Sequence, residues 1–130
     1  MNALRNIHAV LAPAAVLVDT QPTSPHPRVT SQGAVLGTLD MRKWRSTIRA
    51  VDERILEAVG AGLFEMQHEE RLAVTDRFYN GPECLETVGN WRETRIPSMI
   101  RSRLDRREAT VEVEQEVRLR LYRRVTQSLN

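Results

Sequence analysis

A proline-free segment from Asp40 to Phe78 constrains the fold of this chain more than any other stretch of its sequence. Apolar residues recur there at intervals of three and four, which places them on one stripe of an α-helix. They are Met41, Trp44, Ile48, Val51, Ile55, Val59, Leu63 and Met66. About 38 residues at 1.5 Å each would make a rod of nearly 60 Å. The pattern therefore predicts one long helix that needs a partner to cover its apolar stripe.

Two further helices are expected beyond Asn80-Gly81-Pro82, a tripeptide that stops the first one. A short helix is predicted within residues 83–96, before Pro97. The last segment, 108–130, opens with VEVEQEV, whose alternation would also suit a strand. We interpret it as helical because its apolar residues continue at intervals of four, and because an acidic start and an arginine-rich end suit the helix dipole. The predicted fold class is all-α.

Residues 1–39 differ sharply in composition from the rest of the chain. They contain four of the six prolines and one acidic residue, Asp19, so we predict a disordered or loosely ordered leader, followed by a helical domain over 40–130. The apolar run near the start is interrupted by Pro13 and is too short to span a bilayer. We therefore expect a cytoplasmic protein that does not associate with membranes.

Composition limits both the assembly state and the chemistry. A domain of about 90 residues buries little apolar surface on its own, so a homodimer is expected. Cys84 is the single cysteine, which excludes an intramolecular disulfide and a cysteine-based metal cluster. His68 lies close to Glu65, Glu69 and Glu70; this group would suit a metal, although a solvated charged helix face is the preferred interpretation. No metal and no cofactor are predicted.

The stretch RSTIRAVDERILEAVGAGL, which begins at Arg45, resembles the opening helix of the all-helical chorismate mutases and of isochorismate-pyruvate lyase. The matching positions are Trp44-Arg45, Ile48, Val51-Asp52 and Ile55-Leu56. The expected order of a long, a short and a medium helix is also similar to that family. The resemblance implies an intertwined helical dimer that binds chorismate, a dicarboxylate of the shikimate pathway to the aromatic amino acids.

The resemblance also implies site residues. Rearrangement of chorismate is pericyclic and needs cations at fixed positions rather than a nucleophile. Arg45, Arg92 and Glu93 match family positions in the catalytic site. Arg71, Arg77 and Gln127 are the candidates for holding substrate, because the family's main carboxylate-binding arginine falls on Gly62 here and its lysine on Ala73. These departures imply weak or lost activity, so the enzymatic assignment stays open.

Two alternatives remain beside the family resemblance. The arginine-rich C-terminal half, with Arg118, Arg120, Arg123 and Arg124, would suit nucleic acid, where phosphate neutralisation makes affinity fall steeply with salt. Six acidic residues between Glu93 and Glu116 dilute that positive charge and disfavour this alternative. The other alternative is a non-catalytic helical dimer that binds a protein partner along its long helix.

Overall fold

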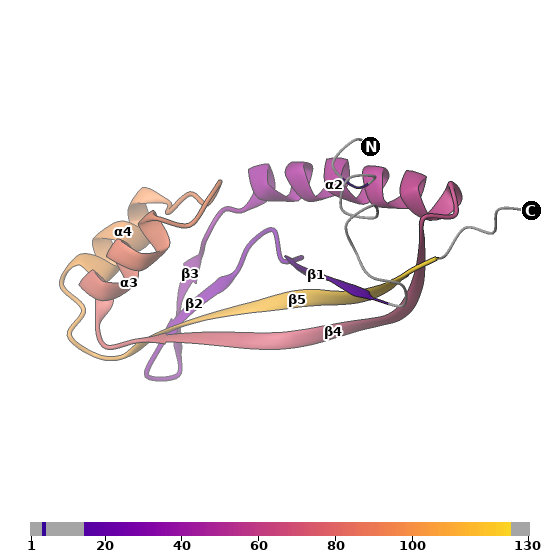
Figure 1. The fold of residues 1–130 in the computed structure, drawn as a ribbon. Helices are drawn as coiled ribbons and strands as arrows, with labels where there is room; N and C mark the ends of the chain where they lie inside the picture. The colour runs from indigo at the N-terminus through magenta and orange to yellow at the C-terminus, as the bar shows by residue number, and fades with distance from the viewer. Residues whose placement is uncertain (1–3, 5–14, 126–130) are drawn as a thin grey trace, which may run out of the picture. The chain divides into compact units, whose positions relative to one another are not determined.

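The computed structural model describes Leu4 and residues 15–125, and its architecture is α+β. In chain order the elements are β1 (Val16–Pro22), β2 (Arg28–Ser31), β3 (Ala34–Thr38), α2 (Arg42–Gly60), β4 (Phe64–Phe78), α3 (Gly81–Gly89), α4 (Ser98–Asp105) and β5 (Val111–Arg124) (Figure 1). The five strands form one sheet. The prediction of an all-α fold is therefore wrong, and so is the intertwined helical dimer that was based on it. Three of the strands lie before Asp40.

The long helix expected between Asp40 and Phe78 ends at Gly60. Gly62 has a left-handed φ of 77°. Its N–H donates to the carbonyl of Val59 at 3.0 Å, and the N–H of Leu63 donates to the carbonyl of Ala58 at 3.0 Å. These two bonds form a Schellman motif, which ends helices at a glycine. Gly62 therefore separates α2 from β4.

The prediction of a C-terminal helix is also wrong, because the strand β5 occupies Val111–Arg124. An interval of four residues suits a helix, but four is also a multiple of two, the period of a strand. Val111 and Leu119 extend the apolar pattern at two-residue spacing, which keeps side chains on one face only in a strand. The alternation in VEVEQEV was therefore the informative signal.

Strand β5 pairs with three neighbours and joins the sheet together. The strand order is β1-β5-β2-β3, and β4 pairs with β5 as well. β2 runs antiparallel to β5, with Val29 opposite Val113. β2 and β3 form a hairpin in which Ser31 lies opposite Ala34. The two loop residues, Gln32 and Gly33, have φ values of 51° and 77°, as a type I′ turn requires.

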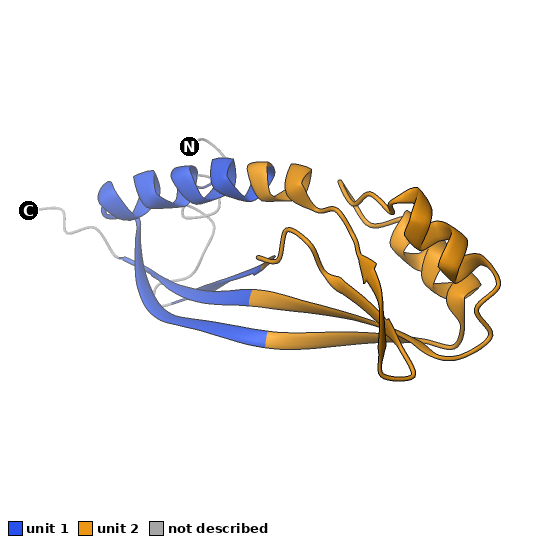
Figure 2. Ribbon diagram, turned by 180° about the vertical axis from the view of Figure 1, so that it is seen from behind, with its two compact units in different colours: residues 1–21, 47–72, 118–130 blue, residues 22–46, 73–117 orange. Residues whose placement is uncertain are grey.

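The chain divides into two compact units, and each is assembled from separate stretches of sequence (Figure 2). Unit 1 comprises residues 1–21, 47–72 and 118–130. Unit 2 comprises residues 22–46 and 73–117. α2, β4 and β5 each contribute residues to both units.

Unit 2 contains the larger apolar core. Its members are Val29, Leu36, Leu39, Phe78, Cys84, Val88, Ile96, Ile100, Leu104, Val111 and Val113, which are at most 9% exposed. Gly81 begins α3 where the chain approaches the end of α4. A Cβ on Gly81 would lie 1.8 Å from the carbonyl oxygen of Leu104, so only glycine fits. Close contact between α3 and α4 thus depends on this residue.

Unit 1 has a smaller apolar cluster between α2 and the strands. Its buried members are Ile55, Ala58, Leu63, Phe64 and Tyr122, and Leu17 packs against them from β1. Helix α2 therefore buries an apolar stripe, as its sequence predicts, but buries it on a sheet rather than on other helices.

Candidate functional site

The residues predicted to be catalytic do not share one pocket in the part of the chain that the structure describes. Arg45 lies on an exposed side of α2. Arg92 and Glu93 are consecutive residues of the loop between α3 and α4, yet they line two different hollows. The sheet-rich fold contradicts membership of the chorismate mutase family and the chorismate-binding function that followed from it.

The residues predicted to hold substrate are also dispersed. Arg71 and Arg77 are exposed residues of β4, and Arg71 belongs to unit 1. Arg77 in unit 2 forms a 2.9 Å ion pair with Glu112 and lines a third hollow. Gln127 lies outside the described residues. The substrate-binding roles of these three residues are not supported by a common location.

The most informative hollow lies in unit 2, where the start of α2 approaches the loop after α3. Its lining residues are Pro22, Met41, Trp44, Asn90, Trp91, Arg92, Thr94 and Gln115, and its volume is about 400 Å³. We call it the tryptophan hollow, because Trp44 and Trp91 are the only tryptophans of the chain. Its volume falls within the range of about 300–1,000 Å³ that is typical of small-molecule sites.

Two buried polar atoms in the lining of this hollow have no hydrogen-bond partner among the described residues. One is the indole Nε1 of Trp44 and the other is the amide oxygen Oε1 of Gln115. Gln115 donates from its amide nitrogen to the carboxylate of Asp76 at 3.3 Å. Because a carboxylate only accepts, this bond fixes the orientation of the amide and leaves its oxygen as the free acceptor. The hollow thus offers one unused donor and one unused acceptor.

A backbone bridge positions the two sides of the tryptophan hollow. The N–H of Asp40 donates to the carbonyl of Arg95 at 2.9 Å, and the N–H of Arg95 donates to the carbonyl of Asp40 at 2.8 Å. At the other end of the loop, the backbone N–H of Trp91 donates to the carbonyl of Val88 at 3.0 Å. This bond connects the backbone of Trp91 to the end of α3. The loop is therefore fixed at both ends against rigid elements.

Glu93 has an unusual backbone conformation within this loop. Its φ is 53°, in the left-handed region that side chains with a Cβ seldom adopt. The residues on either side, Arg92 and Thr94, both line the tryptophan hollow, and the hydroxyl of Thr94 donates to the carbonyl of Arg92 at 3.1 Å. Conformations of this kind cost about 1–3 kcal/mol and cluster at binding and catalytic sites.

A second hollow of about 570 Å³ shares Thr94 with the tryptophan hollow and is lined mainly by charged residues. Four of its five charged residues have partners within the chain. Arg42 forms a 2.8 Å ion pair with Asp40, and a hydrogen-bonded Arg42 holds the pKa of that carboxyl well below its usual range. Lys43 and Glu93 also have interaction partners. Asp40, Arg42, Lys43 and Glu93 are therefore less available to a ligand.

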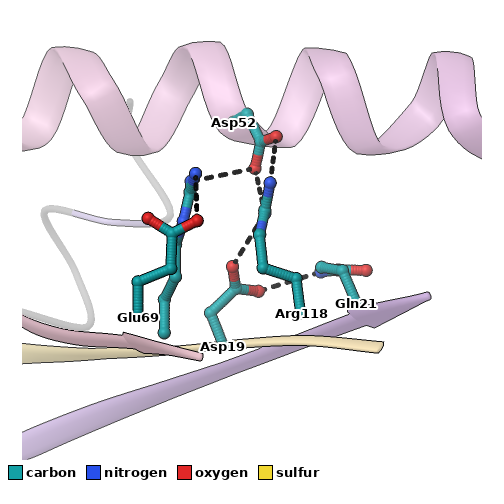
Figure 3. A network of polar contacts seen from close by, with 6 residues as sticks. Asp19, Gln21, Asp52, Glu69 and Arg118 are labelled. Atoms are coloured by element: carbon teal, nitrogen blue, oxygen red, sulfur yellow. Dashed lines mark hydrogen bonds and ion pairs between the residues drawn. The ribbon is translucent and has the colours of Figure 1, made fainter. Parts of the chain in front are cut away.

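Unit 1 contains a buried ionic network centred on Arg118 of β5 (Figure 3). The Arg118 guanidinium lies 2.6 Å from a carboxylate oxygen of Asp52 on α2 and 3.4 Å from one of Asp19 on β1. The Arg118 side chain is 7% exposed. Nearby, Arg120 lies 3.5 Å from Glu69. The ion pairs of this network connect α2 to the strands of unit 1. The apolar cluster beside them connects the same elements by hydrophobic packing.

Most of the arginines that would suit nucleic acid have interaction partners within the chain. Arg118, Arg120 and Arg123 form ion pairs with acids of unit 1. In unit 2, Arg107 donates to the hydroxyl of Ser31 at 2.9 Å, and Arg103 donates to the carbonyl of Leu36. An arginine that already has a carboxylate partner contributes little to phosphate neutralisation. Nucleic-acid binding stays an untested prediction.

Within Leu4 and residues 15–125, no group of three or more histidine, cysteine or acidic side chains is placed to hold a metal ion. His68 lies 3.3 Å from Glu70, and both side chains are about half exposed. Among the described helices, none has the length and apolar character needed to span a bilayer. Cys84 is buried in unit 2, and burial raises the pKa of its thiol to about 11. It therefore stays protonated at neutral pH and is a poor nucleophile.

Most of the tryptophan hollow is not apparent from the sequence. The sequence pattern predicts Trp44 in the apolar stripe of a long helix and Trp91 in a short helix, and it indicates no role for Gln115. One signal was present. The chain has only two tryptophans, and both lie close to the end of a helix: Trp44 near the start of α2 and Trp91 just after α3. The pairing of Asp40 with Arg95, which brings them together, has no local signature.

Comparison with known proteins adds no family to this description. No family model matches the sequence, and no curated protein matches it either.

Proposed function

We propose that the protein is a small-molecule binding protein and that its ligand occupies the tryptophan hollow. The observation that carries this proposal is the presence of two unpaired polar atoms, Trp44 Nε1 and Gln115 Oε1, in one hollow. Leaving a buried donor or acceptor unpaired costs about 1–3 kcal/mol. A ligand that accepts from the indole and donates to the amide oxygen recovers that free energy.

The lining defines the chemical class of the ligand. Two indole rings favour a flat ring, since aromatic groups pack on one another in offset or edge-to-face arrangements. The unpaired donor and acceptor favour a ring that carries both an acceptor and an N–H, as a lactam does. Arg92 lies at the exposed side of the lining and favours an anionic substituent. The proposed ligand is a planar, lactam-like ring that bears a negative charge.

The chain carries its own reporter for this proposal. Both of its tryptophans line the hollow, so any occupant must alter the intrinsic fluorescence. We suggest titration with three probes: orotate, which has a lactam and a carboxylate; uracil, which has the lactam alone; and benzoate, which has the carboxylate alone. Saturable quenching is expected to be strongest with orotate. The proposal is overturned if none of the three probes gives saturable quenching up to about 5 mM. A dissociation constant of that size corresponds to a binding free energy of only about −3 kcal/mol.

Substitutions then test the two unpaired atoms. Gln115→Met removes the acceptor at similar volume and is expected to weaken orotate binding about 10- to 100-fold. Gln67→Met, an exposed substitution in β4, is the matched control and should leave the affinity unchanged. Equal affinities of the two variants would place the ligand elsewhere.

A cytoplasmic location, expected from the sequence, is part of this proposal. Fractionation of cells that express the full chain is the direct measurement.

A further inference from the structure

Strand β4 has an unusual pattern of exposure in unit 1. Phe64 is buried, but the residues from Glu65 to Leu72 are all exposed, so neither face of the strand is covered there. Met66 and Leu72 are 47% and 39% exposed. Among the described strands only β5 pairs with β4, which leaves the other edge of β4 open (Figure 1). Long open edges are templates for pairing with another strand.

The sequence of this edge is complementary to itself. In a symmetric antiparallel pair, a residue at the two-fold axis lies opposite its own copy. With His68 on the axis, Glu65 of each copy lies opposite Arg71 of the other, so this pair of opposite charges occurs twice, beside the 3.1 Å pair that Glu65 forms with Arg123 of its own chain. Phe64 lies opposite Leu72 in the same register, so the ends of the paired segment are apolar.

Neighbouring registers bring like charges together. Placing Gln67 on the axis opposes Glu65 and Glu69 twice. Placing Glu69, Glu70 or Arg71 on the axis opposes that residue with its own copy. Opposite charges that face each other across a strand pair stabilise it, whereas like charges destabilise it. Of the five registers centred on residues 67–71, only the one at His68 opposes no like charges.

We propose that the β4 edge of unit 1 is a homodimer interface, in which two copies pair antiparallel over residues 64–72 with His68 at the two-fold axis. The occupant is a second copy rather than an unrelated strand because of the double Glu65–Arg71 complementarity. This assembly differs from the intertwined helical dimer, which required interlocked helices.

Sedimentation velocity over a range of protein concentrations tests the interface. The wild-type chain is expected to show a concentration-dependent dimer. Glu65→Arg places two arginines opposite each other twice and is expected to raise the dissociation constant about tenfold or more. The double variant Glu65→Arg with Arg71→Glu restores both pairs and is expected to restore dimerisation. Glu57→Arg, on an exposed side of α2 in unit 1, is the matched control.

Cross-linking tests the register without relying on charge. Neighbouring β-carbons at a strand pair lie about 4.5–5.5 Å apart, which permits a disulfide after small adjustment. In a Cys84→Ser background, His68→Cys is expected to give a covalent dimer on mild oxidation. Glu70→Cys lies opposite Met66 and is expected to give none. A monomer at every concentration, or a dimer that Glu65→Arg does not weaken, overturns the proposal.

Discussion

The two units pack their helices on the strands by different means. Unit 2 has an extended apolar core and no charged residue within it. Unit 1 has a smaller apolar cluster and places Arg118, with Asp19 and Asp52, in the adjoining interior. Burying an ion pair stabilises a protein little, but removing one member leaves an uncompensated charge at high cost. Unit 2 therefore supplies net stability, whereas unit 1 supplies a required pairing.

The largest effect is expected from breaking the buried pairing in unit 1. Arg118→Met leaves Asp19 without a guanidinium partner and Asp52 with only that of Arg120 at 3.8 Å, so the free energy of unfolding should fall by about 3–5 kcal/mol. Urea denaturation measures this change. The exposed control, Arg28→Met, breaks a 2.8 Å pair with Glu114 and should cost less than about 1 kcal/mol.

Adding Asp19→Leu and Asp52→Leu to Arg118→Met distinguishes the cost of leaving a charge unpaired from the net contribution of the network to stability. The triple variant should regain much of the loss, because an apolar replacement of a buried pair is often neutral. A triple variant as unstable as Arg118→Met would mean that the network itself contributes net stability, and the contrast between the units would fail.

A somewhat smaller effect is expected from unit 2. Leu104 of α4 is fully buried in the apolar core of unit 2. Leu104→Ala should lower the free energy of unfolding by about 3 kcal/mol, through lost burial and the cavity that remains. The loss should be independent of salt, in contrast to charge substitutions in unit 1. A loss below about 1 kcal/mol would show that the core of unit 2 is loosely packed.

The smallest effect concerns alkaline pH and compares one group from each unit. Burial raises the pKa of Cys84 in unit 2 from 9.0 to about 11, and burial also raises the pKa of Tyr122 in unit 1 above 10.0. A raised pKa favours the protonated form in the folded state. The stability from Cys84 is therefore present below pH 9 and is lost as pH rises towards 11, by about 1–2 kcal/mol.

Denaturation at pH 8 and pH 11 measures this loss for the wild type, Cys84→Ala and Tyr122→Phe. Each substitution should flatten the alkaline decline by removing one group. If Cys84→Ala declines as steeply as the wild type, the thiol titrates in the folded protein as it does in the unfolded chain.

The sequence contains local signals that correctly predict α2, but its signals for β4 and β5 were outweighed by other patterns. The amphipathic stripe predicted α2 correctly as far as Gly60, and Gly62 marked its end. The period-two alternation of β5 was masked by an equally regular interval of four. β4 is rich in glutamate and has little intrinsic preference for a strand, so its conformation depends on pairing with β5.

The interior of unit 1 was not predictable from hydrophobic alternation. Along β5 the apolar residues occupy odd positions from Val111 to Leu121. Unit 2 buries odd positions, Val111 and Val113, but unit 1 buries the even ones, Arg118 and Tyr122. The buried positions therefore change from odd to even along the strand, so Arg118 is buried while Leu119 is only half-buried. Pairing with Asp19 and Asp52, which are distant in sequence, permits this arrangement. The tryptophan hollow was missed for a similar reason, because Asp40 and Arg95 are joined only by tertiary contact.

The segmented make-up of unit 1 has a consequence for synthesis. Asp19 and Arg118 are separated by 99 positions, so at about 5–20 residues per second the carboxylate is made about 5–20 s before its guanidinium. Unit 2 is complete once Val117 has been added, and unit 1 is not. During translation the nascent chain therefore carries Asp19 and Asp52 in solvent, and the interior of unit 1 closes only when the last segment of β5 leaves the ribosome.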